Sequence, residues 1–164
     1  MVNNGYTFLP AYYDRLNREI DYGKWAGDIA DILRSHGIGE DSLVLDLACG
    51  TGSLTVCLAR LGYDMIGADL SAEMLGIARS KSPDVLWLNQ DMRSFELYGT
   101  VKAVVCCLDS VNYLLKLKDL YDCFGLVHNY LEPDGLFIFD VNTGYKFEKI
   151  YAQNHYILDD GDIV

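Results

Sequence analysis

Short apolar runs alternate with longer amphipathic segments along most of this chain. The runs are rich in Val, Ile and Leu and do not alternate strictly with polar residues, which is typical of strands covered on both faces. They predict strands at 43–47, 65–68, 85–88, 101–107 and 135–141. Helices are predicted at 53–61, 72–79 and 117–131. This alternation predicts an α/β fold, with a parallel sheet and helices on both faces.

Two local signals mark boundaries in this pattern. Ser71 directly precedes the helix at 72–79 and can cap it, with Glu73 in the first turn. The sequence EPDG at 132–135 predicts a turn between the helix at 117–131 and the fifth strand.

The first 40 residues carry no strand signal. They predict two helices, at 12–20 and 24–36, which are split near Gly23. Aromatic residues are dense in this segment, and they either pack against the sheet or form a lid over a ligand. The residues themselves leave both interpretations open.

Composition narrows the class of protein. A chain of 164 residues is long enough for one domain, and its formal net charge of -11 argues against binding a nucleic-acid backbone. The five cysteines form no CxxC pair, so reduced thiols and a cytoplasmic location are expected. We expect no signal peptide, because the start lacks a basic segment before an apolar one. We expect no membrane association, because the longest apolar run is too short to span a bilayer. We also expect no metal site.

Aspartates follow the predicted strands at corresponding places. They are Asp46, Asp69, Asp91, Asp109 and Asp140. Ligands of open parallel sheets bind outside the carboxyl ends of the strands, so these acids should gather at one edge. A carboxylate where Asp69 stands can accept hydrogen bonds from both hydroxyls of a ribose. The simpler interpretation is a negative charge at the start of the next helix, beside Ser71.

The loop ACGTGS at 48–53 excludes some nucleotide sites. It lacks the Gly-Lys-Ser/Thr ending of a P-loop, and it has no lysine to meet phosphates. It matches a dinucleotide fingerprint only in part, because the third small position would fall at Thr55. Asp46, placed just before the loop, would repel a pyrophosphate and suits a ligand that carries positive charge.

Four ordered motifs carry a resemblance to a known family. LVLDLACGTGSL, MIGADLSAEML, LNQDMRSF and VVCCLDSVNYL are similar to successive motifs of class I S-adenosylmethionine-dependent methyltransferases. The match covers about 41–142, and the earlier YDRL and DYGKW resemble the N-terminal helices of the small-molecule branch. The resemblance implies a Rossmann-like, doubly wound and mainly parallel sheet with strand order 3-2-1-4-5. It also implies one domain at 1–164, with a helical lid at 1–40, a cofactor-binding core at 41–142 and the start of a cap or further strand at 143–164.

The same resemblance implies S-adenosyl-L-methionine as cofactor and assigns residues to its parts. Its methionine part would contact Asp46, Ala48, Cys49 and Gly50, with Gly50 and Gly52 allowing close approach of the chain. Asp69 with Leu70 would hold the ribose, and Asp91 with Met92 would read the adenine. A carbonyl of Cys107 or Leu108 would accept from the ammonium group. Tyr12 and Trp25 would close over the site.

Methyl transfer from a sulfonium needs an aligned nucleophile, and a general base only if that nucleophile must lose a proton. The sequence identifies no such catalytic residue. Its three histidines, His36, His128 and His155, lie on predicted helices or near the end of the chain. For contact with a small-molecule substrate we expect Asp109, Asn112 and Tyr113.

Two features depart from the family pattern. Ala48 replaces the usual first glycine of the loop, and we expect it to be tolerated because its φ should be negative. The sixth and seventh strands of the family sheet have no signal here. Either the chain is a piece of a longer protein or a partner supplies the edge, and we expect the fifth strand to be paired by the C-terminal tail, a neighbouring chain in a homodimer, or both.

The leading hypothesis is therefore a methyltransferase that acts on a small molecule. The alternative is a cofactor-binding domain, or fragment, without turnover of its own. A nicotinamide dehydrogenase is a third hypothesis, but it needs a third small loop residue and a hydride-side catalytic group, and the sequence offers neither.

Overall fold

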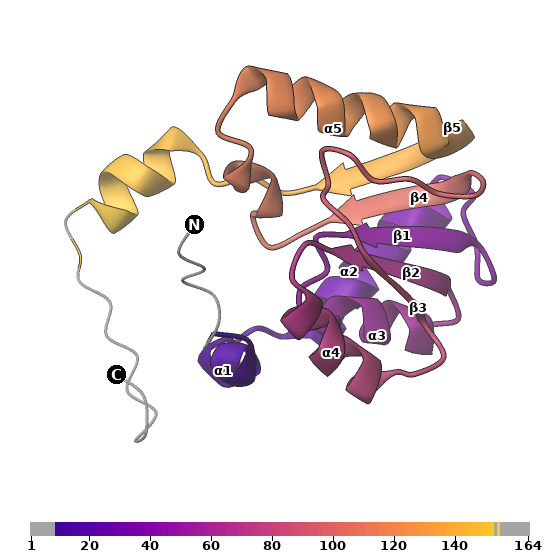
Figure 1. The fold of residues 1–164 in the computed structure, drawn as a ribbon, viewed down its shortest axis with the longest axis horizontal. Coiled ribbons are helices and arrows are strands. Elements are labelled where there is room, and N and C mark those ends of the chain that lie inside the picture. The colour runs from indigo at the N-terminus through magenta and orange to yellow at the C-terminus, as the bar shows by residue number, and fades with distance from the viewer. Residues whose placement is uncertain (1–8, 153, 155–164) are drawn as a thin grey trace.

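A five-stranded parallel sheet forms the centre of the structure (Figure 1). The computed structural model describes residues 9–152 and 154. The strands are β1 (Leu43–Leu47), β2 (Asp64–Asp69), β3 (Leu86–Asn89), β4 (Val101–Cys106) and β5 (Leu131–Phe139). They lie in the order β3-β2-β1-β4-β5, and every neighbouring pair is parallel. The predicted fold class and strand order are confirmed.

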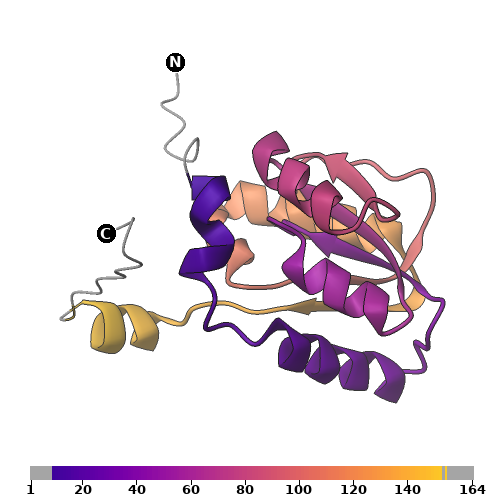
Figure 2. The same ribbon diagram turned by 90° about the horizontal axis from the view of Figure 1, so that it is seen from below.

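Helices cover both faces of this sheet (Figures 1 and 2). They are α1 (Leu9–Leu16), α2 (Tyr22–Ser35), α3 (Ser53–Arg60), α4 (Ala72–Lys81) and α5 (Leu117–Tyr130), with a 3-10 turn, η1 (Ser110–Tyr113), and a π-helical turn, η2 (Lys146–Tyr151). α2 and α3 pack on one face, and α5 packs on the other. α1 lies beyond the carboxyl ends of the strands in both views.

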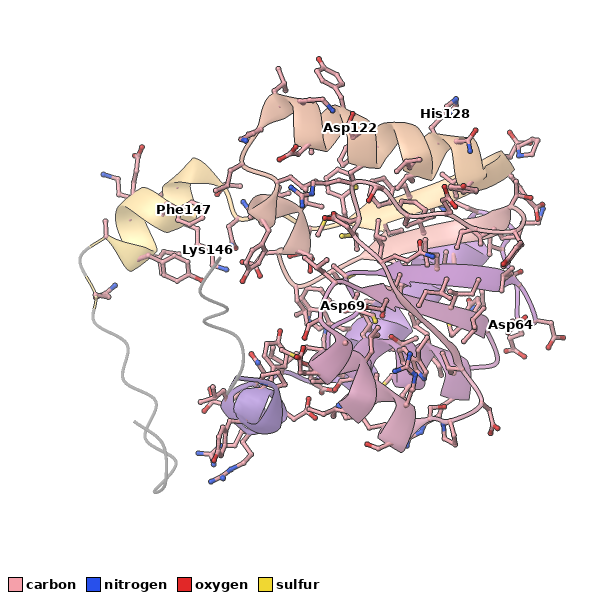
Figure 3. All side chains as sticks on the ribbon, viewed as in Figure 1. Asp64, Asp69, Asp122, His128, Lys146 and Phe147 are labelled. Atoms are coloured by element: carbon pink, nitrogen blue, oxygen red, sulfur yellow. The ribbon has the colours of Figure 1, made fainter. Side chains whose placement is uncertain are left out.

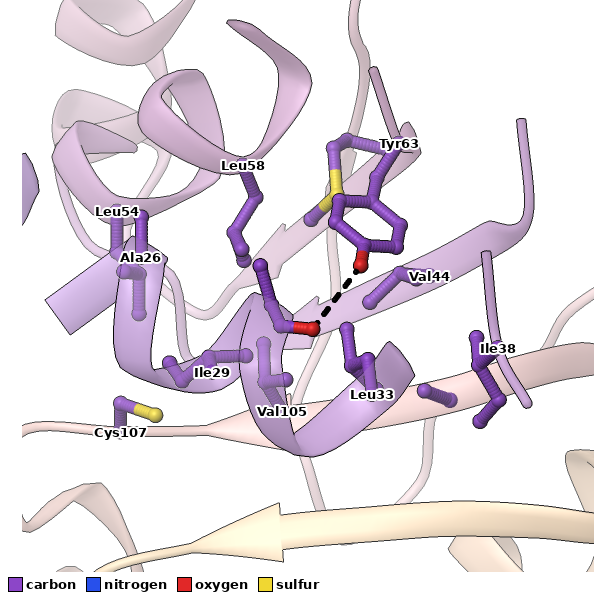
Figure 4. Packing of buried hydrophobic residues seen from close by; sticks show 13 residues of the cluster. Ala26, Ile29, Leu33, Ile38, Val44, Leu54, Leu58, Tyr63, Val105 and Cys107 are labelled. Atoms are coloured by element: carbon purple, nitrogen blue, oxygen red, sulfur yellow. Dashed lines mark hydrogen bonds between the residues drawn. The ribbon is translucent and has the colours of Figure 1, made fainter. Parts of the chain in front are cut away.

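The strand periodicity of two divides the core between the two faces. Val44 of β1 packs under α2 and α3, whereas its neighbour Leu45 packs under α5. Figure 4 shows the first of these clusters, in which Leu33 of α2 lies among strand residues and the Tyr63 hydroxyl donates to the Ala30 carbonyl at 3.4 Å. By the same alternation, Asp46 falls on the α3 side of the sheet.

Several predicted boundaries move, each for a local reason. The helix predicted at 12–20 ends at Leu16, because the Asn17 side chain donates to the Tyr13 carbonyl and the chain turns there. The helix predicted at 24–36 starts at Tyr22, because the Asp21 carboxylate caps it by accepting from the Lys24 N–H at 2.9 Å. The strand at 43–47 lies as predicted, and the ends of the other predicted helices and strands move by at most two residues, except in the fifth strand.

The fifth strand differs most from its prediction of 135–141. β5 starts at Leu131, and EPDG forms an irregular turn within it, where Asp134 has a φ of +63°. Pairing with β4 skips this turn, since Val101 pairs with Leu131 and Ala103 with Leu136. β5 ends at Phe139, where β4 also stops.

β5 is an edge strand of the sheet among the described residues. Its residues are at most half-buried, in contrast to the fully buried centres of β1 and β4. The predicted partner of this edge, the C-terminal tail at 155–164, lies outside the described residues, so its pairing stays a prediction. Within 143–154, where we expected a cap or strand, the chain forms η2. No helix in the described part of the chain has the length and apolarity needed to cross a membrane.

Candidate functional site

β1 contains the most deeply buried acid of the described chain, just before the loop that follows the strand. Asp46 is 2% exposed and accepts a hydrogen bond of 2.5 Å from the Thr55 hydroxyl, which α3 supplies. Burial raises the pKa of Asp46 to about 7, with Asp69 adding to the increase and Thr55 opposing it. A positive charge placed nearby would favour the ionised carboxylate and so gain from this burial.

The loop backbone takes left-handed conformations at three residues, with φ of +61° at Ala48, +56° at Gly50 and +71° at Gly52. The prediction of a negative φ at Ala48 is wrong. The chain must reverse there, so that the Cys49 N–H can donate to the Ala68 carbonyl at 3.0 Å. Alanine in this conformation costs about 1–2 kcal/mol, which the surrounding structure offsets.

Packing explains why position 52 is a glycine, and the sequence does not reveal this. A Cβ at this position would lie 2.4 Å from the Trp87 ring, and a Cβ at Gly67 would lie 2.3 Å from the same ring. Gly50 differs, because a Cβ there would meet nothing within 4 Å. Of the two loop glycines, therefore, Gly50 borders open space and Gly52 admits the side chain of Trp87.

Asp69 fastens this loop to the end of β2. Its two carboxylate oxygens accept from the N–H groups of Gly50 and Ser71, both at 2.8 Å. A carboxylate has about four lone-pair positions, so two remain for further donors such as sugar hydroxyls. Asp69 also places a negative charge at the start of α4, beside Ser71, which caps that helix. Leu70 leaves 67% of its surface exposed next to this acid, which makes it an apolar neighbour for a ligand.

Asp91 follows β3, the next strand of the sheet, and forms hydrogen bonds with Arg93. The Arg93 side chain donates to both of its oxygens, with the shortest contact at 2.5 Å, and the Arg93 backbone N–H donates to one of them at 2.9 Å. These contacts hold the pKa of Asp91 below its usual value. Met92, between them, packs against the core under α5. Three N–H groups of Arg93 thus occupy both oxygens of Asp91, and an adenine amino group would compete with them for this carboxylate.

A cavity lies between this loop and the end of β4. Six residues of the predicted site line it: Asp46, Ala48, Cys49, Gly50, Cys107 and Leu108. The remaining lining residues are Tyr13, Tyr22, Thr51, Ser53, Leu54 and Ser110. The cavity thus brings the β1 loop, the β4 end and the N-terminal helices together.

The aromatic residues of this cavity are not the predicted ones. Tyr12 faces away and is 38% exposed, with the Arg15 guanidinium 5.9 Å from its ring centroid. Trp25 packs into the core under α2. Tyr13 and Tyr22 line the cavity instead. Neither Tyr12 nor Trp25 lines the cavity, and their closure over a bound cofactor stays a prediction.

Asp14 attaches α1 to the site, and no local pattern of the sequence predicts this role beyond its place in YDRL. Its carboxylate accepts from the Thr51 hydroxyl at 2.6 Å and pairs with Lys81, at the end of α4, at 2.6 Å. Burial alone would raise the pKa of Asp14, but Lys81 and the hydroxyls of Thr51 and Ser53 outweigh it, and the pKa is lowered. α1 is thus held against the glycine loop by an ionised carboxylate.

The β4 end forms the far wall of the cavity. Leu108 and Asp109 both have a positive φ, +57° and +54°, and strained backbone of this kind gathers at functional sites. The Ser110 hydroxyl donates to the Cys107 carbonyl at 2.9 Å, and burial raises the pKa of the Cys107 thiol. One carbonyl proposed for the ammonium group therefore already has a partner and keeps one lone pair.

The residues predicted to contact substrate lie just beyond this wall. The Asn112 side chain accepts from the Asn142 N–H at 2.8 Å, and the Asn142 side chain donates to Asp109. Tyr113 is 66% exposed. The Asp109 N–H donates to one oxygen of Asp140, whose other oxygen is buried without a hydrogen-bond partner among the described residues.

Two of the three histidines lie in the described part of the chain, at or on the helices predicted for them. His36 follows α2 and bonds to the Ile32 carbonyl, whereas His128 is on the outer side of α5 (Figure 3). His155 lies outside the described residues.

Comparison with known proteins decides the family. A model of the family described as "Methyltransferase domain" matches residues 44–135, more than half of the chain. The chain belongs to this methyltransferase domain family. The resemblance predicted from the four motifs is confirmed.

Individual members of the methyltransferase family are similar over most of the chain. The protein YqeM of Bacillus subtilis (strain 168) is 36% identical and matches 96% of this chain. The dTDP-3-amino-3,4,6-trideoxy-alpha-D-glucopyranose N,N-dimethyltransferase of Streptomyces venezuelae is 38% identical over 75% of this chain and 52% of its own length. The crystal structure of an S-adenosylmethionine-dependent methyltransferase from Clostridium acetobutylicum ATCC 824 superposes with a TM-score of 0.82 at 33% identity, over 94% of this chain and 64% of the other. The chain spans 64% of the length of YqeM.

Proposed function

We propose that this protein binds S-adenosyl-L-methionine at the carboxyl ends of β1, β2 and β4 and transfers its methyl group to a small-molecule acceptor. Family membership supports the reaction class, and the methyltransferase names of its relatives support the cofactor and the acceptor class. The observation that carries the proposal is the pair of acids around one loop. Asp46 lies buried beneath it, and Asp69 holds the Gly50 N–H from its open side.

The electrostatics of the site favour a cationic ligand. The cavity next to Asp46 is lined by no lysine or arginine among the described residues, and Asp69 adds a second negative charge. Bound S-adenosylmethionine supplies a methyl group that its sulfonium already activates. The positive charge of that sulfonium would stabilise the ionised form of Asp46 in its buried place.

The protein's own residues then bind the cofactor and orient it toward the acceptor. Asp69 accepts from the ribose hydroxyls with its two remaining lone pairs, and Cys107 or Leu108 offers a carbonyl to the ammonium group. Tyr13 and Tyr22 cover the cavity from the N-terminal helices and exclude water from it. Holding both reactants in line supplies much of the barrier reduction in a transfer of this kind. Asp109, Asn112 and Tyr113 border the acceptor side.

Titration calorimetry with S-adenosylhomocysteine tests this proposal. Asp69→Asn should weaken binding by about tenfold to a hundredfold, because it removes a charged acceptor of hydrogen bonds. Asp64→Asn is the matched control, since Asp64 lies at the opposite end of the same strand (Figure 3). Thermal unfolding of both variants separates loss of binding from loss of fold.

The ligand offers a second control. An analogue without the ribose 2′ and 3′ hydroxyls should bind wild type and Asp69→Asn alike. Equal binding of S-adenosylhomocysteine by both proteins would contradict the proposed ribose contact. Binding of NAD, with none of S-adenosylhomocysteine, would contradict the proposed cofactor.

The location and partners are also part of the proposal. We place the protein in the cytoplasm, which the free state of its five cysteines supports. A homodimer through the β5 edge fits the half-buried side chains of that strand. The acceptor is a small molecule rather than a nucleic acid, in keeping with the net charge of -11.

A further inference from the structure

Arg93 lies between two carboxylates from different parts of the fold. Its side chain grips both oxygens of Asp91, which follows β3, at distances from 2.5 to 3.1 Å. On the other side, its Nη1 lies 3.7 Å from an oxygen of Asp119, in the first turn of α5. The two acids have equally exposed side chains, at 22%, and Arg93 is more exposed, at 46%. The guanidinium therefore has a second acceptor within a short movement.

Asp91 is fixed beside the acid proposed to hold the ribose. The Gln90 N–H donates to the Asp69 carbonyl at 3.0 Å, and the Asn89 side chain donates to the carbonyls of Asp69 and Leu70. A base attached to a ribose at Asp69 would thus meet Asp91 next. Three N–H groups of Arg93 bond to that carboxylate and involve both of its oxygens, so base and arginine compete for it.

Asp119 is suited to receive the arginine. It lies in the first turn of α5, where the unpaired N–H groups of the helix face it, and it already lies 3.7 Å from Nη1 of Arg93. A guanidinium has five N–H donors in a fixed fork, so Nη1 can take Asp119 as the contacts with Asp91 open. The movement exchanges one ion pair for another, and the neutral adenine amino group donates to Asp91 in place of the guanidinium.

We propose that Arg93 is a positioning residue of the adenine subsite, which moves its ion pair from Asp91 to Asp119 when an adenine amino group takes Asp91. This inference rests on the proposed function. It makes Arg93 a determinant of base specificity as well, because an arginine that stays on Asp91 would favour a base with an oxygen at the same position.

Calorimetry with two ligands tests the inference. The ligands are S-adenosylhomocysteine and its hypoxanthine analogue, in which an oxygen replaces the amino group. Arg93→Ala should tighten binding of S-adenosylhomocysteine by about twofold to fivefold, the range expected for removing one exposed ion pair. The same substitution should weaken binding of the analogue, because the oxygen then faces Asp91 without a donor. A merely structural role would change both affinities in the same direction.

Asp119 completes the test. Asp119→Asn should weaken binding of S-adenosylhomocysteine in wild type, where it removes the second acceptor, and change nothing in the Arg93→Ala background. Asp122→Asn is the matched control on the same helix, since Asp122 pairs with Lys118 at 2.5 Å. Arg93→Ala binding that is unchanged or weaker for S-adenosylhomocysteine would overturn the inference alone. Wild type that fails to bind S-adenosylhomocysteine would overturn the proposed function together with it.

Discussion

Replacing Asp46 with asparagine should stabilise the protein at neutral pH, although it removes the most buried acid of the site. The carboxylate is 2% exposed, and the Thr55 hydroxyl donates to it at 2.5 Å. Asparagine keeps an oxygen for this hydroxyl and has no charge to bury. The variant therefore isolates the cost of ionising a carboxyl group at this position.

The magnitude follows from the pKa of Asp46, which burial raises from 3.8 to about 7. Between these values the unfolded chain has lost the proton of this residue and the folded chain still holds it. Unfolding then releases a proton, so the free energy of unfolding falls as pH rises through this window. At about 1.4 kcal/mol per pH unit, the loss is about 4 kcal/mol by pH 7, and it stops growing above that pH.

Urea unfolding of wild type and Asp46→Asn across this window measures the effect. Titrations elsewhere are shared by both proteins, so the difference between their unfolding free energies reports Asp46. That difference should be small near pH 4, grow by about 1.4 kcal/mol per pH unit and level off above about pH 7. A difference that stays constant from acid to neutral pH would refute the assignment of a buried, protonated Asp46.

Three other predictions concern the loop and the sheet edge. Gly52→Ala should cost about 3 kcal/mol of unfolding free energy, because the new Cβ would clash with Trp87 and the backbone has a positive φ there. Gly76→Ala is the control in the same denaturation experiment. It should be neutral or stabilising, because a Cβ at Gly76 in α4 would meet nothing within 4 Å. Ala48→Val should cost about 2 kcal/mol, whereas Ala48→Gly should be neutral or stabilising by up to about 1 kcal/mol, because glycine relieves the strain of the positive φ; equal effects would contradict the left-handed conformation. Hydrogen exchange should show the outer amides of β5 protected, and a monomer in which they exchange freely would contradict a paired edge.

The sheet was predictable from the sequence because its signal is local and repeated. Each strand is a short apolar run, and each is followed by a helix, so the parallel order follows from chain connectivity. Boundaries were less predictable where side chains set them. Asp21 starts α2 two residues earlier than the hydrophobic pattern indicates. The EPDG turn was predicted, but its place inside β5 depends on pairing with β4.

The site was predictable in part. Acids at strand ends could be located from spacing alone, and six predicted residues line one cavity. The contact between Asp14 and Thr51 joins residues far apart in the sequence, so no local pattern reveals it. Tyr12 and Tyr13 are neighbours on one helix, and only packing decides which of them faces the cavity. The positive φ of Ala48 was missed because alanine rarely adopts it.

A crystal structure of the chain with S-adenosylhomocysteine is the most direct test of the proposed cofactor site. The account predicts the ribose hydroxyls on the Asp69 carboxylate, and the ammonium group at the carbonyl of Cys107 or Leu108 in the cavity beside Gly50. A ligand bound away from the carboxyl ends of β1, β2 and β4, or bound there without contact to Asp69, would contradict it.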